Sequence, residues 1–138
     1  TDVALSAIAR EALRSVDGLE TGGILLGDDA TDGIVIRHAG GPGPKATRGE
    51  RTFMRDLDHA RRLADSAWSE DRSQWIGEWH THPEDHPQPS SLDRSEWTLL
   101  AAQRRDKRPV LAVIIGRRSL YAELVPRSGE GSIFFPVE

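Results

Sequence analysis

The spacing of apolar residues predicts three helices. Apolar side chains recur at intervals of three and four over residues 5–13, which predicts a first helix ending near Asp17-Gly18. The same periodicity over residues 57–68 predicts a second amphipathic helix. A third stripe runs from Trp97 to Arg104, in a helix that should begin just after Pro89.

Apolar runs between these helices predict strands. The run at 21–27 is expected to form a hairpin with residues 34–36, turning at Thr31-Asp32-Gly33. Further strands are predicted at Gln74–Thr81, at the continuously apolar Val110–Ile115, at Leu120–Val125, and at the edge in Ile133–Val137. Residues 38–51 are so rich in Gly and Pro that an irregular, mobile loop is expected. The pattern predicts an α/β fold, a mixed β-sheet flanked by helices.

Length and charge narrow this picture. A chain of 138 residues suits one domain, 1–138. The formal net charge of −4 makes nucleic-acid binding through gross charge unfavourable. No apolar run reaches the roughly 20 residues that span a bilayer, and the N-terminus lacks a signal-peptide pattern, so a soluble protein of the cytoplasm, with no membrane partner, is expected.

Two histidines separated by one residue are the strongest chemical signal. Side chains alternate along a strand, so His80 and His82 face the same side and can reach one ion. Asp93 follows a Pro-rich turn and can return as a third ligand. Three protein ligands leave the fourth position of Zn²⁺ open, as in catalytic sites. The chain has no cysteine, so a metal here must be held by His and carboxylate.

Hydrolysis also requires a carboxylate that can move protons. Two candidates stand near the histidines: Glu20, at the start of the first predicted strand, and Glu78, on the same face as His80 and His82. Pattern and spacing alone do not decide between them. Ser90 and Asp93 also have the spacing of an N-terminal capping box, and a cap would fix the approach of Asp93 to the metal.

Glu20 before Gly22-Gly23, the pair His80-Thr81-His82-Pro83, and Ser90 three residues before Asp93 together resemble the JAMM (MPN+ or JAB) metalloproteases in order and spacing. The resemblance implies the JAMM/MPN, cytidine-deaminase-like architecture. It implies that Glu20 is the general acid/base and that His80, His82 and Asp93 hold Zn²⁺. It further implies that Ser90 helps to hold the oxyanion. Thr81 stands where eukaryotic relatives commonly have Ser.

The segment Gly77 to Glu84 is similar to the bacterial branch found in anti-phage operons, above all the peptidase of cyclic-oligonucleotide signalling (CBASS) operons. That resemblance implies a substrate in which an E1/E2-like enzyme has joined the C-terminus of a cGAS-like nucleotidyltransferase to a target. A peptidase for a bacterial ubiquitin-like modifier or sulfur-carrier protein fits the same motif. A non-catalytic scaffold of this fold is the rival from another class, although scaffolds have lost ligands that are present here. A zinc nucleobase deaminase is excluded because it needs cysteine ligands.

Overall fold

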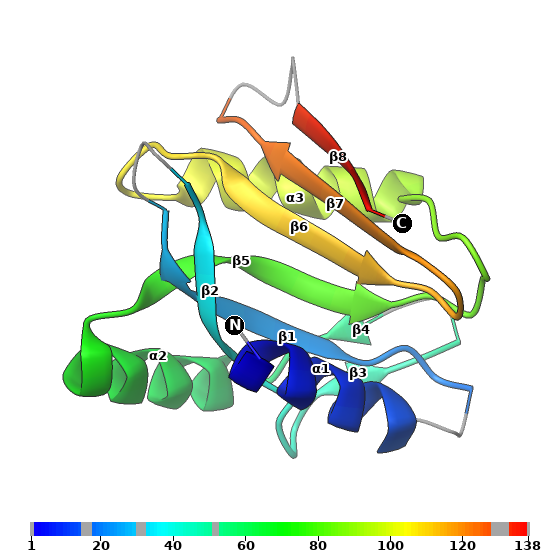
Figure 1. The fold of residues 1–138 in the computed structure, drawn as a ribbon, viewed down its shortest axis with the longest axis horizontal. Coiled ribbons are helices and arrows are strands. Elements are labelled where there is room, and N and C mark those ends of the chain that lie inside the picture. Colours follow the sequence, from blue (N-terminus) through cyan, green and yellow to red (C-terminus); the bar gives the residue numbers. More distant parts are fainter. Residues whose placement is uncertain (1, 15–17, 30–32, 51–52, 128–132, 138) are drawn as a thin grey trace. The chain divides into compact units, whose positions relative to one another are not determined.

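The computed structural model describes residues 2–14, 18–29, 33–50, 53–127 and 133–137. The chain consists of two compact units, Thr1–Thr81 and His82–Glu138. Each unit contains both helices and strands (Figure 1). In the first unit the elements are α1 Asp2–Arg14, β1 Gly22–Asp28, β2 Val35–Ala39, β3 Thr47–Arg48, β4 Phe53–Met54, α2 Leu57–Asp71 and β5 Gln74–Thr81. In the second they are α3 Ser91–Gln103, β6 Val110–Ile115, β7 Leu120–Val125 and β8 Ile133–Val137.

The first unit is built on three antiparallel strands in the order β2-β1-β5. Helix α1 packs against β2, and α2 packs against β1 and β5. The apolar face of α2 meets β1, and the buried side chains there are Ile24, Leu26 and Ala67. Burying one such aliphatic side chain contributes about 1.5–3 kcal/mol. The apolar periodicity of α2 therefore determines which face of the helix packs against the sheet.

Two glycines at the start of β1 leave no room for a side chain. Gly22 stands opposite His80, and a Cβ at Gly22 would come within 2.2 Å of the Trp79 carbonyl oxygen and 2.9 Å of the His80 Cα. A Cβ at Gly23 would come within 1.9 Å of the Gly40 carbonyl oxygen. That same oxygen accepts a hydrogen bond from the buried Trp79 indole at 2.9 Å. The Gly22-Gly23 pair is thus required by close packing of backbones around His80.

The second unit contains the antiparallel strands β6-β7-β8, with α3 packed against β6 and β7. Strand β6 is almost wholly buried, as its unbroken apolar run predicts. Across this packing, the ring of Trp97 on α3 stacks on that of Tyr121 on β7, with centroids 6.4 Å apart. Strand β8 pairs only with β7 in this order, which confirms its predicted edge position.

Most predicted elements are confirmed, and one region is corrected. The strand at residues 74–81, the helix after Pro89 and the β6-β7 pair have the predicted bounds. The tip of the first hairpin at residues 31–32 and the end of the first helix lie outside the described residues. The prediction of an irregular segment over 38–51 is wrong in part, because His38 and Ala39 pair with β1, and Thr47–Arg48 pairs with Phe53–Met54 as a small hairpin. The Gly and Pro residues here lie between short strands and do not prevent them from forming.

Among the described residues, no helix is long and apolar enough to cross a membrane.

Packing at Gly22 generates a stability prediction. Gly22→Ala should lower the free energy of unfolding by about 1–3 kcal/mol, because β5 must shift to admit the methyl group. Gly41→Ala is the matched control, since a Cβ there meets only the Glu11 carboxylate, at 3.8 Å. Urea titration followed by circular dichroism measures both. Equal midpoints for the two variants would show that the backbone approach at Gly22 is not limiting.

Candidate metal centre

Glu20 lies two residues before β1 and is buried, with 5% of its surface exposed. Its backbone N–H donates to the Gly49 carbonyl at 2.7 Å, and its own carbonyl accepts from Arg48 Nε at 3.1 Å. Arg48 also donates to the Leu19 carbonyl, at 3.5 Å. The β3-β4 hairpin therefore holds the backbone on both sides of the Glu20 side chain.

A pair of threonines joins the start of β1 to the end of β5. The Thr21 N–H donates to Thr81 Oγ1 at 3.0 Å, and the Thr81 N–H donates to the Thr21 carbonyl at 2.9 Å. The Thr21 hydroxyl in turn donates to Glu11 on α1 at 2.8 Å. Because Thr21 and Thr81 are each one residue from Glu20 and His80, this clamp brings the carboxylate to the imidazole.

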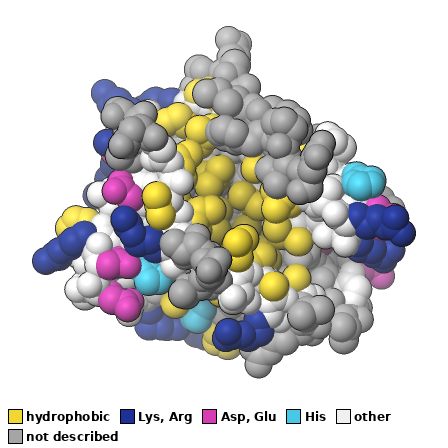
Figure 2. Space-filling view, in the orientation of Figure 1, with side chains coloured by type: hydrophobic (Ala, Val, Ile, Leu, Met, Phe, Trp, Pro, Cys, Tyr) yellow, Lys and Arg dark blue, Asp and Glu magenta, His cyan; other side chains and the backbone are white. Residues whose placement is uncertain are grey.

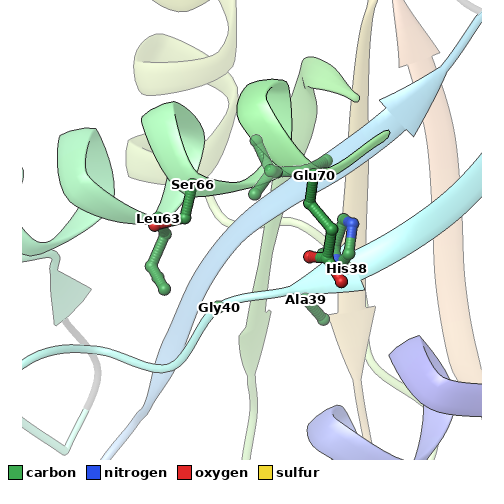
Figure 3. A pocket seen from close by; sticks show the side chains of 8 residues that line it. His38, Ala39, Gly40, Leu63, Ser66 and Glu70 are labelled. Carbon is green, nitrogen blue, oxygen red and sulfur yellow. The ribbon is translucent and has the colours of Figure 1, made fainter. Parts of the chain in front are cut away.

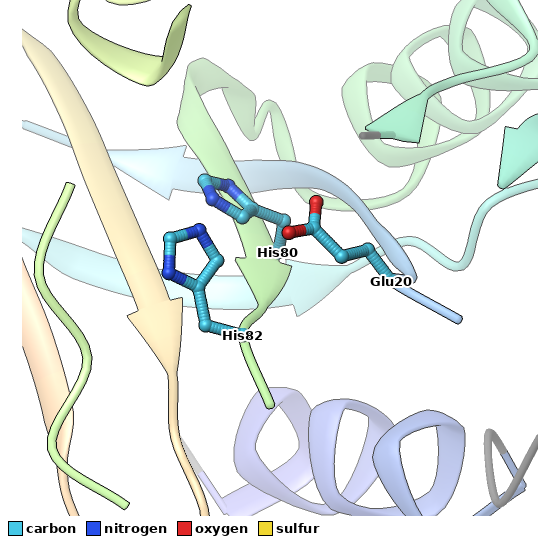
Figure 4. Close-up of side chains that lie close together, drawn as sticks. All are labelled: Glu20, His80 and His82. Carbon is cyan, nitrogen blue, oxygen red and sulfur yellow. The ribbon is translucent and has the colours of Figure 1, made fainter. Parts of the chain in front are cut away.

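Glu20, His80 and His82 form one group of potential metal ligands. Each offers a ligand atom, and these atoms all lie within 4.8 Å of one another (Figure 4). Only Thr81 separates the two histidines, so the alternation of an extended chain turns both rings to the same side. Zn–N and Zn–O bonds are about 2.0–2.2 Å long, which places two ligands of one ion roughly 3–4 Å apart. The 4.8 Å limit is slightly larger than this span, so small side-chain rotations would bring the two imidazoles and the carboxylate onto one divalent metal of the zinc type.

Glu78, the other candidate base, is not in this group. Its carboxylate forms an ion pair with Arg55, the residue that follows β4. Both side chains are largely buried, with 23% of Arg55 and 17% of Glu78 exposed. The structure therefore places Glu20, and not Glu78, beside the two histidines.

Ser90 and Asp93 form the predicted capping box at the start of α3. Ser90 Oγ accepts from the Asp93 N–H at 3.1 Å, and Asp93 Oδ2 accepts from the Ser90 N–H at 2.8 Å. The same Oδ2 lies 3.1 Å from His82 Nε2, with Asp93 and His82 both buried. His82 itself is held by its N–H, which donates to the Ile115 carbonyl at 3.0 Å. The cap thus aims Asp93 at one of the two histidines.

Two contributors to this centre escaped the sequence reasoning. Arg48 fell within a stretch predicted to be irregular, and Thr81 was taken only as a substitute for Ser between the histidines. The alternation of β5 already turns Thr81 away from the histidine face. Its hydroxyl was the available signal, since a polar group at that position needs a partner on the neighbouring strand.

A separate pocket lies in the first unit and contains none of these residues. It has a volume of about 150 Å³ and is lined by His38 to Gly40 and by one face of α2 (Figure 3). His38 Nε2 lies 2.8 Å from Asp71 Oδ2. Hydrogen bonding from Ser73, and then from His38, lowers the pKa of Asp71 to about 2. His38 is thereby accounted for by its contact with Asp71.

Charged and apolar side chains occupy different parts of the face shown in Figure 2. On the face that Figure 2 shows, Lys and Arg side chains lie beside acidic side chains at the margins, while apolar side chains gather toward the centre. With a net charge of −4, such a mixed surface gives no support to polyanion binding.

Comparison with known proteins identifies relatives over most of the chain. Residues 1–126 match the family model described as prokaryotic homologs of the JAB domain. A Pseudomonas aeruginosa protein named CD-NTase/cGAS isopeptidase is 51% identical over 121 residues, covering 86% of this chain and 77% of that protein. Proteins of the same name from Escherichia coli and Vibrio cholerae are 30% and 32% identical, and each alignment covers 74% of this chain and 65% of the relative.

One solved structure extends the comparison of the fold. The solution structure of a protein from Desulfitobacterium hafniense aligns with a TM-score of 0.69 at 14% identity, covering 97% of this chain and 86% of that one. At that identity the likeness concerns the fold alone. Together with the family match, it confirms the predicted α/β fold with a mixed sheet flanked by helices.

Proposed function

Because the chain belongs to the prokaryotic JAB family, we propose that it is a zinc-dependent isopeptidase. The proposed reaction is hydrolysis of the bond that links the C-terminus of a nucleotidyltransferase of the cGAS type to a target protein. The observation that carries this proposal is the grouping of Glu20 with His80 and His82 within 4.8 Å. A carboxylate buried beside two imidazoles is costly unless it is paired or binds a metal, so this grouping favours a metal centre over a scaffold.

We assign zinc to His80, His82 and Asp93. The 3.1 Å separation of His82 Nε2 and Asp93 Oδ2 matches the spacing of two ligands on one ion. When bound, Zn²⁺ supplies a Lewis acid that polarises a carbonyl and lowers the pKa of water. All three ligands must lose or lack a proton, so zinc affinity falls as pH falls.

Glu20 moves the proton in this mechanism. Its carboxylate accepts a proton from the attacking water and passes it to the nitrogen of the leaving amine, so one residue acts first as base and then as acid. Hydrogen bonds from Arg48 and to Gly49 fix its backbone, while Glu78 is engaged by Arg55. The fixed backbone and the burial of Glu20 keep its carboxylate beside the two histidines.

Ser90 has a second role beside its cap. Its oxygen accepts a hydrogen bond from the Asp93 N–H, which leaves the hydroxyl proton available for donation. We propose that this O–H stabilises the developing oxyanion. The cap then serves catalysis twice, because it orients both the serine and the aspartate.

We infer the substrate from the names of the relatives. Those names favour a nucleotidyltransferase conjugate over the conjugate of a separate ubiquitin-like modifier. The E1/E2-like enzyme that would make the linkage is proposed from the family resemblance alone. We propose action in the cytoplasm, in anti-phage defence, by a single catalytic domain over residues 1–138. The chain spans only about two thirds of the E. coli and V. cholerae relatives, so their remaining segments are not represented in this proposal.

Metal analysis tests the zinc assignment. Purified protein loaded with zinc and desalted should retain about one ion per chain, and a His80→Ala, His82→Ala double variant should retain almost none. The matched control is the double variant His38→Ala, His59→Ala, which removes the same number of imidazoles elsewhere. Equal zinc in the two double variants would sink the assignment.

Replacing Glu20 separates binding from catalysis. Glu20→Gln should keep zinc and lose turnover, because an amide cannot shuttle a proton; general acid–base catalysis contributes about 10²–10⁴-fold. The measurement is kcat on a purified nucleotidyltransferase conjugate. Glu78→Gln is the control and should stay active, unless the Arg55 pair is needed for folding, which a melting curve reveals. An inactive, folded Glu78→Gln beside an active Glu20→Gln would reverse the assignment.

Two substitutions at Ser90 distinguish capping from catalysis. Ser90→Ala should cost about 1 kcal/mol of stability, whereas Ser90→Gly should cost only a few tenths, since glycine is tolerated at an N-cap. Both lack the hydroxyl, so both should lose on the order of 10²–10³ in kcat. If only the alanine variant loses activity, and does so in step with its stability, Ser90 is a cap and nothing more.

A further inference from the structure

The second unit contains a buried carboxylate that the proposed mechanism does not use. Glu123 on β7 has 2% of its surface exposed. The Tyr121 hydroxyl donates to its Oε1, and the Arg94 guanidinium spans both oxygens, with Nη1 3.3 Å from Oε2 and Nη2 3.4 Å from Oε1. Arg94 Nη2 also donates to the Tyr121 oxygen, at 3.4 Å. A buried carboxylate is costly unless it is paired in this way.

This network grips the first turn of α3. Arg94 directly follows Asp93, and Trp97, one turn later, stacks on Tyr121. A polar and an aromatic contact therefore tie the same stretch of helix to β7. Burial, reinforced by the Glu123 carboxylate, raises the pKa of Tyr121, so the phenol remains a donor to Glu123 at neutral pH.

The rotation of α3 about its axis matters for Asp93. Its Oδ2 lies 3.1 Å from His82 Nε2, and the His82 N–H is bonded to Ile115 at the end of β6. Strands β6 and β7 are paired along their whole length. His82 is bonded to β6, and the helix that carries Asp93 is bonded to β7, so one strand pair positions both residues. The capping box orients Asp93 relative to the helix, but only contacts outside the helix orient the helix itself.

We propose that Arg94 and Glu123, with Tyr121, are positioning residues that hold Asp93 in place as a metal ligand. The inference rests on the zinc site of the proposed function and adds to it a support reaching from β7. Groups that orient metal ligands commonly change metal affinity by 10–100-fold when replaced. The sequence could not reveal this role, because the contact joins Arg94 to Glu123, 29 residues away, and leaves no local pattern.

The test is the zinc dissociation constant of Arg94→Met, Glu123→Gln and their double variant, measured by competition with a chromophoric chelator. Each single variant should bind zinc about 10–100-fold more weakly. The double variant should be little worse than either single one, because the two side chains act as one unit. Arg118→Met is the matched control: it breaks an ion pair with Asp85 in the same unit, between side chains 75% and 51% exposed, and should leave affinity unchanged.

Cobalt substitution supplies a readout that a merely structural role would not move. The visible absorption of the Co²⁺ form reports ligand geometry, and it should change in Arg94→Met and Glu123→Gln but not in Arg118→Met. Arg94→Lys keeps the charge without the two-pronged donor and should recover part of the affinity. It also serves as the test if Glu123→Gln does not fold.

Two results would overturn the inference while leaving the zinc site intact. One is affinity within twofold of wild type in Arg94→Met and Arg94→Lys. The other is weaker binding that only tracks lost stability in urea, with an unchanged Co²⁺ spectrum. Failure of the wild-type protein to bind zinc would instead overturn the proposed function.

Discussion

The candidate site depends first on the register between β1 and β5. Gly22 faces His80, and the reciprocal hydrogen bonds of Thr21 and Thr81 lock this pairing at its end. A slip of one residue would turn every side chain to the opposite face of the strand, separating Glu20 from His80. The two glycines permit the close approach, and the clamp selects one register. Chemistry at this site is therefore set by main-chain geometry before any side chain is placed.

A second constraint acts on Asp93. In its capping box, one carboxylate oxygen satisfies the Ser90 N–H and also points at His82. A helix N-terminus attracts negative charge, so the start of α3 is a suitable place for an acidic metal ligand. The strand register positions Glu20 and His80, and the helix cap positions Asp93. Both belong to elements that pack against an apolar core. Together, the strand register and the helix cap restrict the motion of the site residues.

Strong local patterns made the fold readable from the sequence. Residues 74–81 and 110–115 carry strand signals, Pro89 and Ser90 mark a helix start, and the α/β class follows from their alternation. Glu20, His80 and His82 were predicted together, and the structure groups them. Pattern and spacing left both Glu20 and Glu78 open as the base, and only the family resemblance chose Glu20. The Arg55–Glu78 pair joins residues 23 apart in sequence and leaves no local pattern. Arg48 was missed for the same reason. The glycines and prolines of residues 38–51 indicate turns, but they do not show that Thr47–Arg48 pairs with Phe53–Met54.

The most direct test of the central claim is X-ray absorption at the zinc edge of the loaded protein. The account predicts one zinc with two imidazole nitrogens and a carboxylate oxygen among its ligands, at about 2.0–2.2 Å. The multiple-scattering signature of imidazole makes the histidine count measurable. A zinc ion surrounded by oxygen alone, with no imidazole scattering, would contradict the account.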